Sequence, residues 1–205
     1  EINLLALDFG NEQSHDSALK EFTEKQGTID FVIHAAGISK AKNNADFYRV
    51  NFGNTRNLVN ALQRNKWVPQ KFIYISSLAA YGPGQKTDPI REGHDKCPLT
   101  AYGKSKMQAE QFLYGLHDFP FLVINPTTVY GPRDKDVLFL LKTIERSLEV
   151  YIGQTGQLLS FVHVQDLCEA IFLSMESSLV NTNLLVSDGK VYTPKMFNRI
   201  VKTRM

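Results

Sequence analysis

The chain has 205 residues, of which 43% are hydrophobic, and it carries 23 basic against 21 acidic side chains. A chain of this length buries one sizeable core, so we expect one compact domain with an appendage. The basic side chains form no long run, which argues against binding to nucleic acid or to an anionic membrane. The expected partner is therefore a small molecule.

The two cysteines, Cys97 and Cys168, belong to no CxxC or other metal-ligand spacing. The sequence therefore predicts neither a disulfide framework nor a metal site, and it favours a reducing, cytoplasmic setting. No apolar run approaches the roughly 20 residues that span a bilayer, so we expect no membrane-spanning helix.

Strand-length apolar runs alternate with helical patterns along almost the whole chain, which is typical of an α/β fold with a parallel sheet. The expected strands are 2–7, 31–34, 71–75, 121–125 and 184–186, with shorter ones at 150–152 and 158–162. The expected helices are 15–26, 46–65, 101–117, 137–147, 164–176 and one that begins at 194. A change in composition predicts a core over residues 1–131 and a small, mainly substrate-binding lobe over residues 132–205, with some elements returning to the core.

Tyr102 and Lys106 lie four residues apart near the start of an expected helix, which puts both side chains on one face. A free phenol has a pKa of about 10, and an ammonium within roughly 4 to 6 Å favours its ionised form. Tyr102 could then give or take the proton of an alcohol while a cofactor handles the hydride. On an exposed helix the same pair would be only a solvated face.

Further candidate residues follow two of the strands, where ligands bind in doubly wound sheets. Ser77 could hydrogen-bond the reacting oxygen opposite Tyr102, although a serine at a strand end also commonly bonds its own backbone. Asn51, on a long helix, could orient Lys106 or a water molecule, or could simply lie on the helix surface.

Three small residues, Ala35, Ala36 and Gly37, follow the buried strand 31–34. They would let the backbone pass close beside a nucleotide. Tight packing between strand and loop would select the same residue types, so both interpretations stand for this segment.

Taken together and in this order, seven segments resemble the extended short-chain dehydrogenase/reductase family, the NAD-dependent epimerase/dehydratase group. The segments are Asp8, His34 to Gly37, Val50-Asn51, Ser76 to Gly82, Tyr102 to Lys106, Pro126 to Pro132 and Phe161 to Asp166. No segment is decisive alone, but their order and spacing are specific and cover almost the whole chain. The resemblance implies a Rossmann-like doubly wound parallel sheet that binds NAD or NADP.

The resemblance also implies a role for each matched residue. Ser77 would hold the substrate oxygen, Tyr102 would be the general acid/base, and Lys106 would lower the pKa of Tyr102. Asn51 would complete the catalytic set from behind the site, and residues 153–164 would face the substrate. Asp8 and Phe9 would contact the adenine of the cofactor, and Ala35, Ala36 and Gly37 would line the path of the nucleotide. Tyr102 and Lys106 would contact the ribose, and Pro126 to Val129 would border the nicotinamide.

The chain departs from the family pattern in three places. The family's first strand and glycine-rich pyrophosphate turn do not occur, and residues 2–7 resemble its third strand, so we expect an upstream segment. Leu159 replaces an arginine that clamps diphosphate in sugar-nucleotide members, which weakens that substrate class. Leu78 and Ala79 replace the Asp-Glu pair of the dehydratases, so a 4,6-dehydratase is not expected.

The expected function is an NAD(P)-dependent oxidoreductase or epimerase that acts on a secondary alcohol or ketone, either a sugar nucleotide or an apolar alcohol. A catalytically silent dinucleotide-binding sensor or scaffold of the same fold is the alternative. A helix-mediated interaction module would require the spacing of Ser77, Tyr102 and Lys106 to be accidental. The resemblance further implies a homodimer formed through the 101–117 helix.

Overall fold

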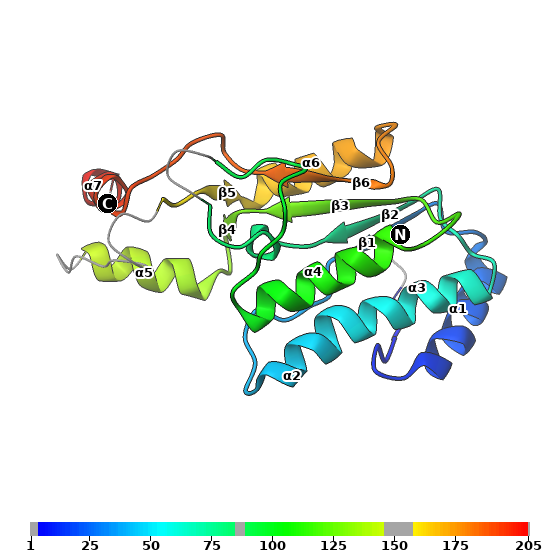
Figure 1. Ribbon diagram of the computed structural model, residues 1–205. Coiled ribbons are helices and arrows are strands. Elements are labelled where there is room, and N and C mark those ends of the chain that lie inside the picture. The colour runs from blue at the N-terminus through cyan, green and yellow to red at the C-terminus, as the bar shows by residue number, and fades with distance from the viewer. Residues whose placement is uncertain (1–3, 85–88, 146–157, 205) are drawn as a thin grey trace.

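The computed structural model describes residues 4–84, 89–145 and 158–204 (Figure 1). Within these ranges, a main sheet of four parallel strands has the order β1-β2-β3-β6. Its strands are β1 (Phe31–His34), β2 (Lys71–Ile75), β3 (Phe121–Pro126) and β6 (Thr182–Val186). A separate parallel pair is formed by β4 (Thr128–Tyr130) and β5 (Phe161–His163). The predicted α/β fold is confirmed.

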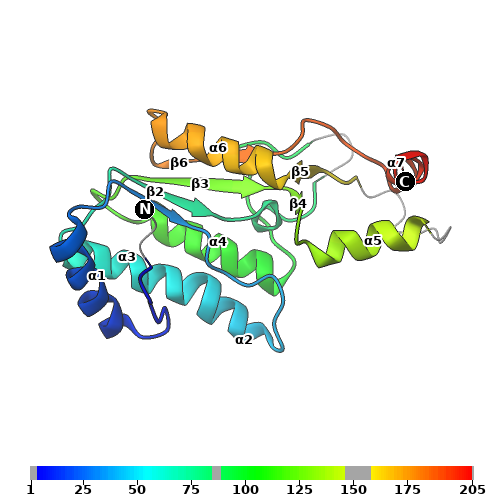
Figure 2. The same cartoon turned by 180° about the vertical axis from the view of Figure 1, so that it is seen from behind.

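Helices cover both faces of the main sheet (Figures 1 and 2). One face carries α1 (Glu12–Gln26), α2 (Asn44–Phe47), α3 (Thr55–Arg64) and α4 (Ala101–Tyr114), and the other carries α6 (Val164–Glu176). Two further helices, α5 (Lys135–Glu145) and α7 (Pro194–Arg204), lie beside each other away from the sheet. The predicted division into a core and a lobe at residue 131 stays a prediction. No helix in the described ranges is long and apolar enough to cross a membrane.

The core lies on both sides of β2 and β3, because alternate side chains of a strand point to opposite faces of the sheet. Phe72 and Tyr74 of β2 pack with Val123 toward α3 and α4, and Ile73 packs with Ile124 toward α6. Burial on both faces explains the nearly continuous apolar composition of these strands. Cys97 and Cys168 are both exposed free thiols, and the cytoplasmic setting stays a prediction.

The strand expected over residues 2–7 is wrong for its described part, because residues 4–7 adopt no regular structure. Leu4 is 96% exposed, whereas Leu5 packs against the core. Extended backbone becomes a strand only where a neighbouring strand pairs its N–H and C=O groups, and no described strand pairs with this segment.

Other boundaries also differ from the sequence-based expectation. The helix expected over 46–65 consists of α2, a π-helical segment (Tyr48–Asn54) and α3. The strand β4 was not expected, and the strand expected over 158–162 begins at Phe161, after an isolated bridge between Leu159 and Tyr192. The strand expected at 150–152 lies outside the described residues.

Candidate functional site

The site forms at the carboxyl ends of β1, β2 and β3, where α4 begins. Thr100 caps α4, since its Oγ1 accepts a hydrogen bond of 3.0 Å from the Gly103 backbone N–H. This cap starts the helix so that Tyr102 falls in the first turn and Lys106 in the second. Opposite the helix, Ser77 caps a short 3-10 turn (Leu78–Ala80) just past the end of β2.

Ser77 and Tyr102 meet across this junction, near enough for the Ser77 side chain to act on the pKa of Tyr102. Ser77 Oγ also accepts a hydrogen bond of 3.2 Å from the Ala79 N–H, so the hydroxyl is held by its own turn as well. The ring of Phe47 stands edge-on to Tyr102 at 5.9 Å between centroids. The Ser77 hydroxyl just past β2 and the Tyr102 phenol on α4 therefore lie together at the carboxyl edge of the sheet.

Gly103 allows α4 to come this close to the Ser77 turn. A Cβ at this position would stand 2.3 Å from the Ala79 backbone oxygen and 3.0 Å from Pro98 Cβ. Neither neighbour is the far end of a flexible side chain, so only a hydrogen atom fits there. The glycine beside Tyr102 thus decides how near the phenol lies to Ser77.

Lys106 lies beneath the site with only 5% of its surface exposed. Its Nζ donates a hydrogen bond of 2.8 Å to the Ile75 carbonyl and stands 4.9 Å from the ring centroid of Tyr74. Burial lowers the pKa of Lys106 to about 8, and the nearby Glu110 carboxylate acts in the opposite direction. At neutral pH the side chain is therefore mostly an ammonium.

The pKa of Tyr102 is raised, mainly by burial, while the Ser77 side chain acts to lower it. This direction differs from the lowered pKa that the sequence led us to expect for Tyr102. Burial penalises the charged phenolate, and the ammonium of Lys106 bonds to the Ile75 carbonyl at the end of β2. The protein by itself thus keeps the phenol protonated at neutral pH.

Asn51 is completely buried in the π-helical segment, so it is not a helix-surface residue. Its Oδ1 accepts from the Ile38 N–H at 2.8 Å, and its Nδ2 donates to the Ile38 carbonyl and to Ser105 Oγ, both at 3.0 Å. The amide therefore ties the loop after β1 to α4. A π-helical turn is rare and is often found at functional sites.

The loop of Ala35, Ala36 and Gly37 is exposed at the end of β1. A Cβ on Gly37 would stand 2.9 Å from Asn51 Oδ1 and 3.3 Å from Lys106 Nζ. The bare backbone of Gly37 thus passes directly over a buried amide and a buried ammonium.

The other residues expected to bind the cofactor lie at the end of β3 and before α1. Pro126 is buried and Val129 packs partly buried against the α6 side of the core. Asp8 is exposed, and its Oδ1 accepts a hydrogen bond of 2.9 Å from the Gly10 N–H. The ring of Phe9 packs 5.8 Å from that of His34, so these two residues lie at the flank of β1 and not against Tyr102.

His34 is a buried neutral imidazole at the end of β1. Thr55 Oγ1 donates to the Asn51 carbonyl at 2.8 Å, so it accepts from His34 Nε2 at 2.9 Å, and that nitrogen carries the hydrogen. Burial and, to a smaller extent, the positive charge of Lys106 lower the pKa of His34 to about 4. His34 therefore supports the site as an uncharged hydrogen-bond donor.

Sequence reasoning missed one charged residue at the site. Glu110 lies one helical turn beyond Lys106 and is 1% exposed. The repeated spacing of four from Tyr102 to Lys106 to Glu110 was the available signal, since it puts all three on one helix face. No group of three or more His, Cys, Asp or Glu side chains in the described ranges could hold a metal ion.

The fold and the site define an α/β protein of the Rossmann type, with polar groups gathered at the carboxyl edge of its sheet. The model of the NAD dependent epimerase/dehydratase family matches residues 3–185. The chain therefore belongs to this family, and the resemblance found in the sequence is confirmed.

Named relatives include enzymes of more than one kind. The chain is 31% identical over 131 residues to an N-acetyl-alpha-D-glucosaminyl-diphospho-ditrans,octacis-undecaprenol 4-epimerase of Escherichia coli O157:H7, covering 61% of this chain and 38% of that protein. It is 26% identical over 181 residues to a 4-hydroxy-2-methyl-3-oxo-4-farnesyl-3,4-dihydroquinoline-1-oxide ketoreductase of Stigmatella aurantiaca, covering 85% and 53%. The chain thus spans about half the length, or less, of these curated relatives.

Solved structures show the same fold. A UDP-glucose 4-epimerase from Thermotoga maritima, solved with UDP-glucose, superposes with a TM-score of 0.80 at 23% identity over 96% of this chain and 66% of that chain. RMD from Pseudomonas aeruginosa, solved with NADPH, gives 0.79 at 22% identity over 95% and 69%.

Gly103→Ala is expected to lower the free energy of unfolding by about 1–3 kcal/mol, because the new methyl group collides with the Ala79 carbonyl. Urea denaturation measures the change. Gly53→Ala is the matched control, since its Cβ would find its nearest neighbour at 3.7 Å, an ordinary contact. Equal stability of Gly103→Ala and the unaltered protein would show that α4 does not depend on this close approach.

His34→Gln is expected to flatten the loss of stability between pH 6.5 and pH 4. In this window an unfolded chain, with a histidine pKa of 6.5, takes up a proton that folded His34, with a pKa of about 4, does not. Stability therefore falls as the pH falls, by at most about 3 kcal/mol from this group, and levels off below pH 4. Denaturation curves at several pH values test this, with exposed His117→Gln as the control; parallel pH profiles for His34→Gln and the unaltered protein would contradict it.

Proposed function

We propose that the protein is an NAD(P)-dependent oxidoreductase or epimerase that transfers a hydride at a secondary alcohol or ketone, with Tyr102 as the general acid/base. The observation that carries this proposal is the convergence of the Ser77 and Tyr102 side chains beside a buried Lys106, at the sheet edge of a chain of this family. Such convergence is what proton transfer to a bound oxygen requires.

The edge of the sheet fits a dinucleotide. Gly37 leaves space over Asn51 and Lys106 that a side chain would fill, and the buried Thr127 Oγ1, just past β3, has no hydrogen-bond partner in the described structure. NAD or NADP bound there would supply or accept the hydride. The residues proposed to hold it are Asp8, Phe9, Ala35, Ala36, Gly37, Tyr102, Lys106, Pro126 and Val129.

The proton moves through Tyr102. Ser77 Oγ would hold the substrate oxygen beside the phenol, and the protonated phenol that burial favours is the form that donates to a ketone oxygen. In the opposite direction Tyr102 must first lose its proton, and the Ser77 side chain, which acts to lower the pKa of Tyr102, favours that loss. Asn51 contributes by holding α4 against the loop after β1.

The substrate class is a sugar nucleotide or an apolar alcohol or ketone. The named relatives include an epimerase of a sugar that diphosphate links to an apolar polyprenol chain, and a ketoreductase of a farnesylated ring. Leu159 offers no positive charge to a diphosphate, which favours the apolar class. Its backbone is paired with Tyr192 by two hydrogen bonds of 2.8 Å.

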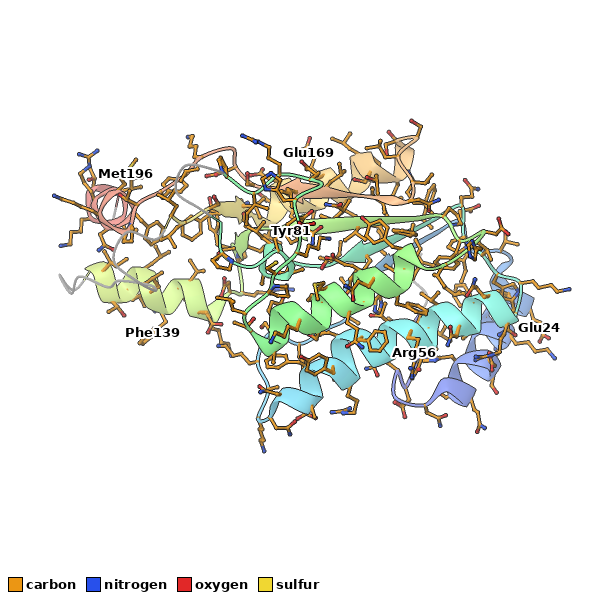
Figure 3. The ribbon with its side chains drawn as sticks, viewed as in Figure 1. Glu24, Arg56, Tyr81, Phe139, Glu169 and Met196 are labelled. Carbon is orange, nitrogen blue, oxygen red and sulfur yellow. The ribbon has the colours of Figure 1, made fainter. Side chains whose placement is uncertain are left out.

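We also propose a homodimer formed through the outer face of α3 and α4. Phe112 of α4 packs edge to face at 6.2 Å against Phe52 of the adjoining π-helical segment, and the guanidinium of Arg56 on α3, labelled in Figure 3, lies 5.4 Å from the Phe52 ring. Leu113, the neighbour of Phe112 on α4, is completely buried in the core, so it cannot contribute to a contact between two protomers. Light scattering should give twice the protomer mass, and Phe112→Asp should shift it toward the monomer while the same change at exposed Phe172, on α6 across the sheet, does not; a monomer at all concentrations would remove this proposal.

Tyr102→Phe in the whole protein is expected to lower kcat by about 10²- to 10⁴-fold, because the acid/base is lost. Turnover is followed by nicotinamide absorbance on a panel of nucleotide sugars and of apolar ketones and alcohols, with calorimetric titration of NAD and NADP. Tyr48→Phe, on the neighbouring π-helical segment, is the control and should keep its turnover.

Full turnover by Tyr102→Phe on a substrate that the unaltered protein converts would show that Tyr102 is not the acid/base. Cofactor binding without turnover on the entire panel would instead favour a dinucleotide-binding sensor or scaffold.

A further inference from the structure

Glu110 is a buried carboxylate that the proton transfer between Tyr102 and a substrate does not use. It lies on the same face of α4 as Tyr102 and Lys106, two turns and one turn further along the helix. Its Oε1 accepts hydrogen bonds from Ser76 Oγ and, at 2.6 Å, from Asn125 Nδ2, and its Oε2 pairs with Lys96 Nζ. Every contact is thus made with a different segment of the chain.

Asn125 connects this carboxylate to Ser77. The Asn125 Nδ2 that donates to Glu110 also donates, at 3.1 Å, to the Ser77 backbone oxygen. Both amide hydrogens are therefore used, and the buried Oδ1 of Asn125 has no partner in the described part of the chain. An unpaired buried oxygen is costly, so the amide orientation must be imposed by the two acceptors on its nitrogen side.

We propose that Glu110 is a positioning residue for Ser77: its carboxylate sets the orientation of the Asn125 amide, and the amide in turn holds the Ser77 turn so that the hydroxyl faces Tyr102. The inference deepens the function proposed above and rests on it wherever turnover is concerned. Glu110 touches neither the substrate nor the reacting atoms in this arrangement.

Lys96 compensates the negative charge of the buried Glu110 carboxylate. Its side chain is 17% exposed, and its Nζ stands 4.6 Å from the ring centroid of Tyr81. The Tyr81 hydroxyl accepts a hydrogen bond of 2.7 Å from Asn183 Nδ2 on β6. A buried charge needs such a partner, and the pair also fixes the loop that follows the Ser77 turn to α4.

Glu110→Gln tests the positioning role because glutamine has one oxygen where glutamate has two. The Lys96 ammonium should take that oxygen, so the NH2 group of the introduced glutamine turns toward Asn125 and the Asn125 amide reverses. Its oxygen then faces the Ser77 carbonyl, and the turn shifts. We expect kcat to fall by about 10- to 100-fold, with KM and cofactor Kd changed by less than about threefold.

A second readout needs no turnover. The Tyr102 hydroxyl titration is followed by NMR with ¹³C-labelled tyrosine and is assigned by its loss in Tyr102→Phe. Moving the Ser77 hydroxyl away from Tyr102 should raise the pKa of Tyr102, whereas loss of the negative charge of Glu110 acting directly would lower it. Should Tyr102→Phe retain turnover, the proposed function fails, but this titration still decides the positioning role.

Further variants guard against a misfolded protein. Adding Lys96→Met to Glu110→Gln frees the glutamine oxygen to face Asn125 again, and kcat should recover to within about threefold of the unaltered protein. Asn125→Leu removes the donor to Ser77 and should reproduce both effects of Glu110→Gln. Glu169→Gln, the same change at an exposed position on α6 across the sheet, should have neither effect (Figure 3).

The proposal is overturned if folded Glu110→Gln keeps both kcat and the pKa of Tyr102, or if that pKa falls. It is also overturned if the folded double variant shows no recovery of kcat, because the effect then belongs to the lost charge and not to the orientation of the amide.

Discussion

The close contact between α4 and the turn after β2 is the constraint on which the site depends. Only a hydrogen atom fits between Gly103 and the Ala79 carbonyl, so the helix passes the turn at the shortest distance that backbone permits. Because α4 is rigid, this one contact also places Lys106 under the end of β2 and Glu110 beside Ser76. The Tyr102 phenol, the Lys106 ammonium and the Glu110 carboxylate thus lie one helical turn apart along the carboxyl edge of the sheet.

Burial controls the chemistry of these groups. It raises the pKa of Tyr102 above the ordinary value of 10 and lowers that of Lys106 from 10.5 to about 8, so the phenol stays neutral and the ammonium becomes the more acidic of the two groups. The Glu110 carboxylate and the neutral imidazole of His34 set the charge around them. In a low-dielectric interior each such group needs a partner, and the described structure supplies one to Lys106, Glu110 and His34.

Much of this could be predicted from the sequence, because it depends on local periodicity. Alternating strands and helices indicated the α/β fold, and the spacing of four indicated that Tyr102 and Lys106 share a helix face. The strand at residues 4–7 was mispredicted because strand formation depends on a pairing neighbour, which apolar composition does not reveal. The burial of Asn51 was also hidden, since a polar residue on a helix is usually exposed.

The sequence by itself thus determined the fold class, the family and the residue types at the sheet edge. Only the tertiary structure decided that Ser77 meets Tyr102, that burial raises the phenol pKa where a lowered one was expected, and that Glu110 reaches Asn125. The physical reason is the distance along the sequence over which each kind of interaction acts. Periodicity and turn chemistry act over a few residues, whereas hydrogen bonding and desolvation depend on segments that meet only when the chain has folded.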